Sequence, residues 1–165
     1  MKNCCTCRLG VASLAGAALL LAVLTSVTAA PLAAGGCETT ASKYKISAAF
    51  QSTTSTIFVD VMETAITFQQ GGSGCVIVSF AGVASASSNT SMYVRARLDG
   101  AADCLPNDNA FAGSGGTASP SADRAMNYVC GNVAPGSHMI KMQFRTGSGP
   151  TVSLGSRTII VHYVK

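Results

Sequence analysis

The chain has 165 residues, of which 48% are hydrophobic and only 11% are charged. Soluble domains usually carry about 25% charged residues, and this length fits one domain more easily than two. The formal net charge of +4 is too small and too scattered to indicate a nucleic-acid-binding protein. High hydrophobicity combined with a low net charge also argues against an intrinsically disordered chain.

The beginning of the chain has the pattern of a secretory signal peptide. Lys2 and Arg8 form a short basic region, and an uncharged run rich in Ala and Leu follows from Leu9 to Leu24. Val27-Thr28-Ala29 then offers the small residues that a signal peptidase needs. The pattern therefore predicts export.

We predict a signal peptide over 1–30, an N-terminal linker over 31–42 and a single β-sandwich domain over 43–165. The exported protein would be secreted, periplasmic or held at the cell surface, with no stable membrane insertion after cleavage. An uncleaved anchor is the alternative, because the apolar stretch 9–30 is just long enough to span a bilayer. Lipidation at Cys37 is disfavoured, because Ala34 replaces the large aliphatic residue that such a site needs.

Four cysteines follow the predicted leader, and an even number in an exported chain indicates two disulfides. They are Cys37, Cys75, Cys104 and Cys130. Three pairings are possible, and we favour Cys37–Cys75 with Cys104–Cys130. The first would tie the N-terminal segment to a core strand, and the second would tie a long loop to the next strand. Zinc is the alternative, but no C-x₂-C pair lies after the leader.

Beyond the leader, short β-rich runs alternate with clusters of Gly, Ser, Asn and Pro, and no run is typical of a long helix. In chain order, the predicted strands cover 43–50, 56–61, 64–68, 75–80, 91–98, 125–130, 133–145 with its Pro-Gly turn, 151–154 and 157–164. Residues 101–124 are predicted as a long loop with a short strand near Phe111. The pattern indicates an all-β, two-layer antiparallel β-sandwich, and the long loops favour jelly-roll or Greek-key connections.

Positive charges alternate with apolar residues in two predicted strands. Arg95 and Arg97 lie on one strand, and Lys141 and Arg145 on another. Since alternate side chains share a face, neighbouring strands would gather these four cations into one patch. Such a patch could receive a sulfated glycan, a phosphate group or an anionic cell-envelope polymer. An ordinary solvated face is the simpler alternative, because Lys and Arg also protect exposed sheet edges.

Catalytic signatures are missing from the sequence. His138 could form a hydrolase site with Asp60 or Asp99, but nothing in the spacing requires it. The run Gly71–Cys75 departs from the G-x-S-x-G pattern at its last position. Two histidines cannot supply a three-His zinc site. We therefore predict no catalytic residue and no cofactor.

One acidic cluster offers a possible cation site. It contains Asp99, Asp103, Asn107, Asp108 and Asn109. Carboxylate and amide oxygens can coordinate Ca²⁺, but the spacing matches no EF-hand, and Asp and Asn are also common turn residues. A calcium-assisted carbohydrate-binding module is one alternative function. It is weakened because the chain has no Trp and only four Tyr for a sugar platform.

Two hairpin motifs resemble those of a known class of domain. Residues 132–144 are similar to the PG-x-H-x-[IV]-x-V pattern with which a strand begins in many exported bacterial β-sandwich domains. Arg95–Gly100 resembles the V-x-LDG strand end often found upstream of it. Together they resemble an uncharacterised family of secreted, jelly-roll-like bacterial proteins. The resemblance implies the fold and a bacterial source, and it assigns no functional residue.

We therefore predict a secreted, non-enzymatic β-sandwich with a binding or assembly role at the cell surface or outside the cell. Self-association is one prediction, by analogy with jelly rolls that form trimers through sheet faces, and the face carrying Met92 or Ile140 would be its interface. A glycan or a cell-envelope polymer is another candidate partner. A carbohydrate-binding module is the main alternative, and an exported hydrolase using His138 or the acidic loop is the second.

Overall fold

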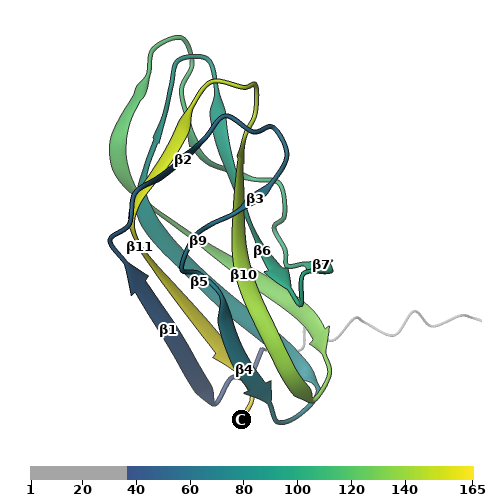
Figure 1. The fold of residues 1–165 in the computed structure, drawn as a ribbon. Coiled ribbons are helices and arrows are strands. Elements are labelled where there is room, and N and C mark those ends of the chain that lie inside the picture. Colours follow the sequence, from purple (N-terminus) through teal and green to yellow (C-terminus); the bar gives the residue numbers. More distant parts are fainter. Residues whose placement is uncertain (1–36) are drawn as a thin grey trace, which may run out of the picture. The chain divides into compact units, whose positions relative to one another are not determined.

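The computed structural model describes residues 37–165, in which two antiparallel sheets pack face to face (Figure 1). The predicted signal peptide and residues 31–36 of the predicted linker lie outside these described residues. The strands are β1 (Ala41–Ser47), β2 (Gln51–Thr53), β3 (Val59–Asp60), β4 (Ile66–Gln70), β5 (Gly74–Ala86), β6 (Ser91–Leu98), β7 (Ala102–Asp103), β8 (Ala110–Gly113), β9 (Ser119–Val133), β10 (Gly136–Thr146) and β11 (Val152–Tyr163). Between residues 37 and 165 there is no helix that could span a membrane.

Strand order identifies the type of sandwich. Sheet A contains β1, β11, β5 and β9 in that order, and β2 continues the β1 edge along β11. Sheet B has β10 and β6 at its centre, with β3 and β4 on one edge and β7 and β8 on the other. When β1–β2, β3–β4 and β7–β8 are each taken as one interrupted strand, this order is that of a jelly roll. The predicted all-β, two-layer antiparallel sandwich is confirmed.

Period-two alternation directs one side of each central strand into the core. In β10, for example, Ile140, Met142 and Phe144 are fully buried, while the residues between them face outward. The largest fully buried side chains are Tyr128, Phe68, Phe80, Phe144, Met92, Ile140, Met142, Leu154 and Ile159. The predicted interface around Met92 and Ile140 is therefore wrong, because both residues belong to the core between the sheets.

Several strand boundaries differ from the predicted ones. β9 begins at Ser119, inside the predicted loop 101–124, because it pairs along β5 as far as Ala86. Both strands are therefore longer than 75–80 and 125–130. The predicted loop also contains β7 and β8. β8 is the short strand predicted near Phe111, whereas the sequence does not predict β7, because its two residues are too few to show an alternating pattern.

Three further differences lie at the ends of the domain. The predicted strand 56–61 is reduced to β3, and Ile57 is 77% exposed instead of buried. The predicted strands 151–154 and 157–164 form the single strand β11, with a bulge between Leu154 and Arg157. β1 begins at Ala41, within the predicted linker.

Both disulfides are present in the pairing that we favoured. Cys37 is bonded to Cys75 at the start of β5, and Cys104 is bonded to Cys130 of β9. Beside the second bond, Leu105 and Val129 exchange backbone hydrogen bonds of 2.9 and 2.7 Å. Disulfides persist in oxidising compartments, so the two bonds are compatible with an extracellular or periplasmic protein.

Arg157 closes the side of the sandwich where the edge strands of the two sheets meet. It follows the bulge in β11 and is only 3% exposed. Its guanidinium donates hydrogen bonds to the carbonyl oxygens of Ala49 (2.8 Å), Met62 (3.1 and 3.2 Å) and Gly155 (3.1 Å). One buried side chain thus joins the β1–β2 connection of sheet A to the β3–β4 connection of sheet B.

Gln51 strengthens the same junction. Its side-chain amide donates to the carbonyl oxygen of Asp60 (2.9 Å), and its oxygen accepts the N–H of Met62 (2.8 Å). Ser47 of β1 also donates to Glu63. These contacts satisfy backbone groups that would otherwise lack partners between the sheets.

We expect Arg157→Met to lower the free energy of unfolding by about 3 kcal/mol, because buried carbonyl groups lose a charged donor. Urea unfolding followed by circular dichroism measures this difference. The control is Arg124→Met, which removes the same charge at an exposed position of β9 and should cost less than about 0.5 kcal/mol. Equal losses in both variants would contradict the closing role of Arg157.

Candidate functional site

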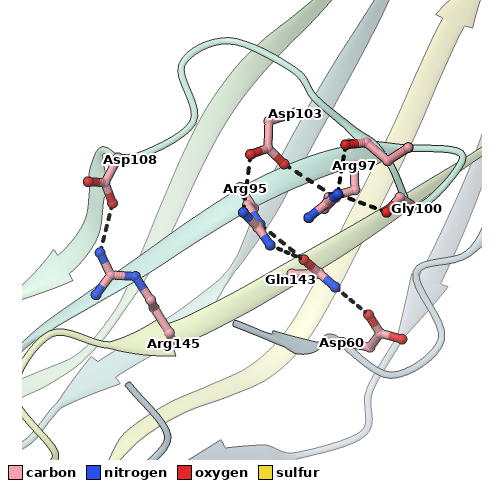
Figure 2. Close-up of polar contacts among 9 residues, drawn as sticks. Asp60, Arg95, Arg97, Gly100, Asp103, Asp108, Gln143 and Arg145 are labelled. Atoms are coloured by element: carbon pink, nitrogen blue, oxygen red, sulfur yellow. Dashed lines mark hydrogen bonds and ion pairs between the residues drawn. The ribbon is translucent and has the colours of Figure 1, made fainter. Parts of the chain in front are cut away.

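The four basic residues of the predicted patch lie together on the outer face of sheet B, and Figure 2 shows three of them, Arg95, Arg97 and Arg145. β6 and β10 are neighbours, and their register places Arg97 opposite Lys141 and Arg95 opposite Gln143. Arg145 follows two positions further along β10, on the same side. The condition under which these four cations share one patch, that the two strands are neighbours, is therefore met.

Carboxylates from neighbouring segments already occupy this face. Asp103 of β7 forms ion pairs with Arg95 (3.1 Å) and Arg97 (3.3 Å). Arg97 also donates to the carbonyl oxygens of Gly100 and Ala101. Both guanidinium groups thus have acceptors within the same molecule.

The two cations of β10 are paired as well. Lys141 contacts Asp60 and Arg145 contacts Asp108, each at 2.8 Å. Hydrogen bonds from Lys141 and then from Gln143 lower the pKa of Asp60, so that it stays ionised in this network. The patch combines four cations with three carboxylates, and only one positive charge is in excess.

An aromatic side chain also contributes to this face. Phe58 lies under the guanidinium of Arg95, 4.0 Å from the ring centre, and Arg145 is 5.1 Å from the same ring. Arg145 also stacks on Tyr93 at 4.3 Å. Because the charges face partners of the same chain, the outer face of sheet B offers few free donors to an anionic ligand.

The acidic residues that the sequence offered as a possible calcium site instead contact different cationic side chains of the fold. Asp103 and Asp108 pair with arginines, and Asp99 contacts His138. Across residues 37–165, no three His, Cys, Asp or Glu side chains converge as metal ligands would. The acidic residues of this region therefore serve as partners for cations of the fold.

His138 and Asp99 join two turns at one end of sheet B. Asp99 and Gly100 both have positive φ values (53° and 70°), which suits the tight Asp-Gly turn that follows β6. This turn places the carboxylate of Asp99 2.7 Å from Nδ1 of His138 and 2.8 Å from the N–H of Met139. Nε2 of His138 lies 2.9 Å from the carbonyl oxygen of Ala134.

Both ring nitrogens of His138 therefore face acceptors, which favours the doubly protonated imidazolium. The hydrogen bond to Asp99 raises the pKa of His138, and the bond to Ala134 acts in the same direction. Burial by itself would raise the pKa of Asp99, but hydrogen bonds from His138 and Met139 outweigh it and lower that pKa. An imidazolium has no free lone pair with which to act as a general base. The geometry thus fits a structural contact that holds the Asp99-Gly100 turn against the turn before β10 better than it fits a catalytic dyad.

The outer face of sheet A is chemically different. From β1 to β9, its rows of neighbouring side chains are Ser42, His162, Ile77 and Val129; Tyr44, Ile160, Ser79 and Asn127; and Ile46, Thr158, Ala81 and Ala125. None of these is Asp, Glu, Lys or Arg. We call these three rows the sheet A face.

Large and small residues divide the sheet A face into a raised margin and a shallow centre. Tyr44 and Ile46 are 69% and 72% exposed on one side, and Val129 is 44% exposed on the other, next to Leu105 at 64%. Between them lies a hollow of about 80 Å³. Its lining includes Ser79, Ala81, Ala125, Asn127, Thr158 and Ile160.

Sequence reasoning missed this face. The run Cys75–Phe80 is almost continuously apolar, so its sequence does not show which of its side chains lie on the outer face. In the structure Val76, Val78 and Phe80 are buried, whereas Ile77 and Ser79 face outward. The available signal was the alternation of Tyr44 and Ile46 with lysines, which puts apolar side chains on one side of β1.

Compared with known proteins, the chain matches no protein-family model and no curated sequence.

We expect the His138–Asp99 contact to make stability depend on pH in a defined direction. Because the pKa of His138 is raised on folding, its contribution is complete below its ordinary value of about 6.5 and is lost as the pH rises through the raised value. Asp99 has a lowered pKa, so its contribution is lost only as the pH falls below about 4. Urea unfolding at a series of pH values measures this profile.

At about pH 5.5, His138→Gln should lower the free energy of unfolding by about 1 kcal/mol, because Asp99 is partly exposed and the contact is screened. The variant should also lose less stability than the unchanged protein between about pH 6 and 9. His162→Gln is the control and should keep the original profile. If the stability of His138→Gln depended on pH in the same way as that of the unchanged protein, the structural role of the His138–Asp99 contact would be refuted.

Proposed function

We propose that this protein is a non-enzymatic, exported β-sandwich that assembles with copies of itself through the sheet A face. It would act outside the cell or at the cell surface, and we infer a bacterial source from the hairpin motifs. The observation that carries the proposal is the contrast between the two outer faces. Sheet B pairs its charges internally, whereas the sheet A face contains no Asp, Glu, Lys or Arg and exposes Tyr44 and Ile46.

The shape of the sheet A face is suited to contact with a second copy of the chain. The hollow, whose lining includes Ser79, Ala81 and Ala125, lies between exposed apolar side chains on both margins. In an isologous contact the same surface serves both partners, so a raised margin of one copy could enter the hollow of the other. Large exposed apolar patches on soluble proteins commonly mark interaction sites. Self-association would remove this apolar surface from water.

Carbohydrate binding is less well supported. Of the four tyrosines, Tyr128 and Tyr163 are buried, and Tyr93 is covered by Arg145. This leaves Tyr44 as the exposed tyrosine for stacking on a sugar ring. An enzymatic role is also less well supported, because both nitrogens of His138 face acceptors.

The test is the solution mass of the full chain, recovered with its disulfides formed, by light scattering after size exclusion over a range of concentrations. We expect a mass that is a multiple of the chain mass. Ala125→Arg places a charge at the exposed hollow and should weaken association at least about tenfold, because a charge buried at an interface needs a partner. The control Ala101→Arg adds the same charge in the turn after β6 and should leave the mass unchanged.

A monomer at every concentration would overturn the proposal. So would an oligomer that Ala125→Arg leaves intact while the variant folds normally by circular dichroism. A mass that changes on adding calcium would instead support the acidic loop from Asp99 to Asn109 as a cation site.

A further inference from the structure

A cleft lies on the same side of the sandwich as Arg157, where edge strands of the two sheets face each other. Its lining residues belong to β1, to β4 and to the position just before β4. These two strands lie at edges of opposite sheets (Figure 1). Its volume is about 530 Å³, within the range of about 300–1,000 Å³ that is usual for binding sites. The cleft is lined by Ser42, Lys43, Tyr44, Lys45, Ala65, Ile66 and Thr67.

The charge of this cleft is one-sided. Lys43 and Lys45 contribute two positive charges, and no carboxylate lines the cleft. Lys43 donates to the carbonyl oxygen of Thr67 (2.8 Å), which extends its side chain across to β4. Within residues 37–165, neither lysine forms an ion pair, whereas all four cations of the sheet B patch do. The nearby Glu63 accepts a hydrogen bond from Ser47.

The free edge of β1 offers backbone hydrogen-bonding groups in addition to the charges of the cleft. β1 is the terminal strand of sheet A and pairs along its whole length with β11. The N–H and C=O groups on the other side of an edge strand are available to an added strand. Lys43 and Lys45 border the cleft, while Tyr44 and Ile46 project on the sheet A face. An added strand would therefore meet lysines on one side and apolar groups on the other.

Charge decides what kind of strand fits. In an antiparallel pairing of two β1 strands centred on Tyr44, each Lys43 would stand opposite the Lys45 of the other copy. Like charges directly opposite each other destabilise a strand pair. A strand with carboxylates at these positions would instead satisfy both lysines. The β1 edge is thus unfavourable for a second copy and favourable for an acidic segment.

We propose that β1 is a docking site for an extended segment of a partner protein in which acidic and apolar residues alternate. The segment adds to sheet A as an antiparallel strand beside β1. Its carboxylates pair with Lys43 and Lys45 in the cleft, and its apolar side chains pack beside Tyr44 and Ile46. This site differs from the self-association proposed above because it uses the strand edge and the cleft instead of the hollow, although Tyr44 and Ile46 border both surfaces.

The probe is a capped peptide of alternating Glu and Val that matches the seven residues of β1. Its binding to the full, oxidised chain is measured by fluorescence anisotropy. We expect saturable binding that weakens as salt is added, and no comparable binding of a peptide of alternating Lys and Val. Peptide N-methylated at alternate residues should bind at least about tenfold more weakly, because added strands bind through main-chain hydrogen bonds.

Lys45→Glu should weaken binding of the Glu-Val peptide by about tenfold, since it replaces a favourable cross-strand pair with a repulsive one. The matched control is Arg124→Glu, the same charge reversal on β9 at the opposite edge of sheet A, which should change the affinity less than about twofold. Amide hydrogen exchange adds a structural readout. Bound peptide should slow exchange within Ala41–Ser47.

Three results would each overturn this site: no binding of the Glu-Val peptide, equal binding of the Lys-Val peptide, or undiminished binding of the N-methylated peptide. In those cases the lysines would serve only to prevent β1 from pairing with other copies. Light scattering of Lys45→Glu separates the two proposals. Loss of peptide binding with an unchanged oligomer mass would support the β1 site, whether or not the sheet A face associates.

Discussion

Phe68, Phe80 and Phe144 belong to one buried cluster between the two sheets, and the long strands β5, β6, β10 and β11 all contribute buried side chains to it. Burial of apolar surface stabilises the folded state by about 25 cal/mol per Å². Because side chains alternate along each strand, one face of each sheet packs into the core. Tyr128 shares the core, where its hydroxyl donates to the carbonyl oxygen of Val94 and burial raises its pKa. Since the inner faces are fully used, ligands and partners can reach only the outer faces and the edges.

The edges of the sandwich are closed at some places and open at others. Arg157 and Gln51 join the β1–β2 and β3–β4 connections through backbone groups, and a disulfide ties Cys104 to β9. Between β1 and β4 the hydrogen bond from Lys43 to the carbonyl oxygen of Thr67 crosses the side, and a cleft lined by two lysines remains. An edge strand bordered by unpaired charge can resist pairing with its own copies and still accept a strand of opposite charge.

The two outer faces differ because their charges have different partners. On sheet B, aspartates from β3, β7 and the following loop neutralise the cations of β6 and β10. On sheet A, the outward positions of the three rows carry no Asp, Glu, Lys or Arg, and Tyr44 and Ile46 lie at their margin; Asp123 follows in the next row. A network of satisfied ion pairs gains little from a new anion, whereas an exposed apolar face gains from any contact that excludes water. This difference places the proposed assembly on sheet A.

The sequence by itself determined the all-β sandwich, the strand from Ser91 to Leu98 and the side of the predicted strand 133–145 on which Lys141 and Arg145 lie. Local alternation and turn residues are sufficient for these features. Only the tertiary structure decided that β9 extends to Ser119, that Asp60, Asp103 and Asp108 neutralise the basic patch, and that Arg157 closes the side of the sandwich. These features depend on groups that are distant in the chain, and no local pattern encodes which of them will meet.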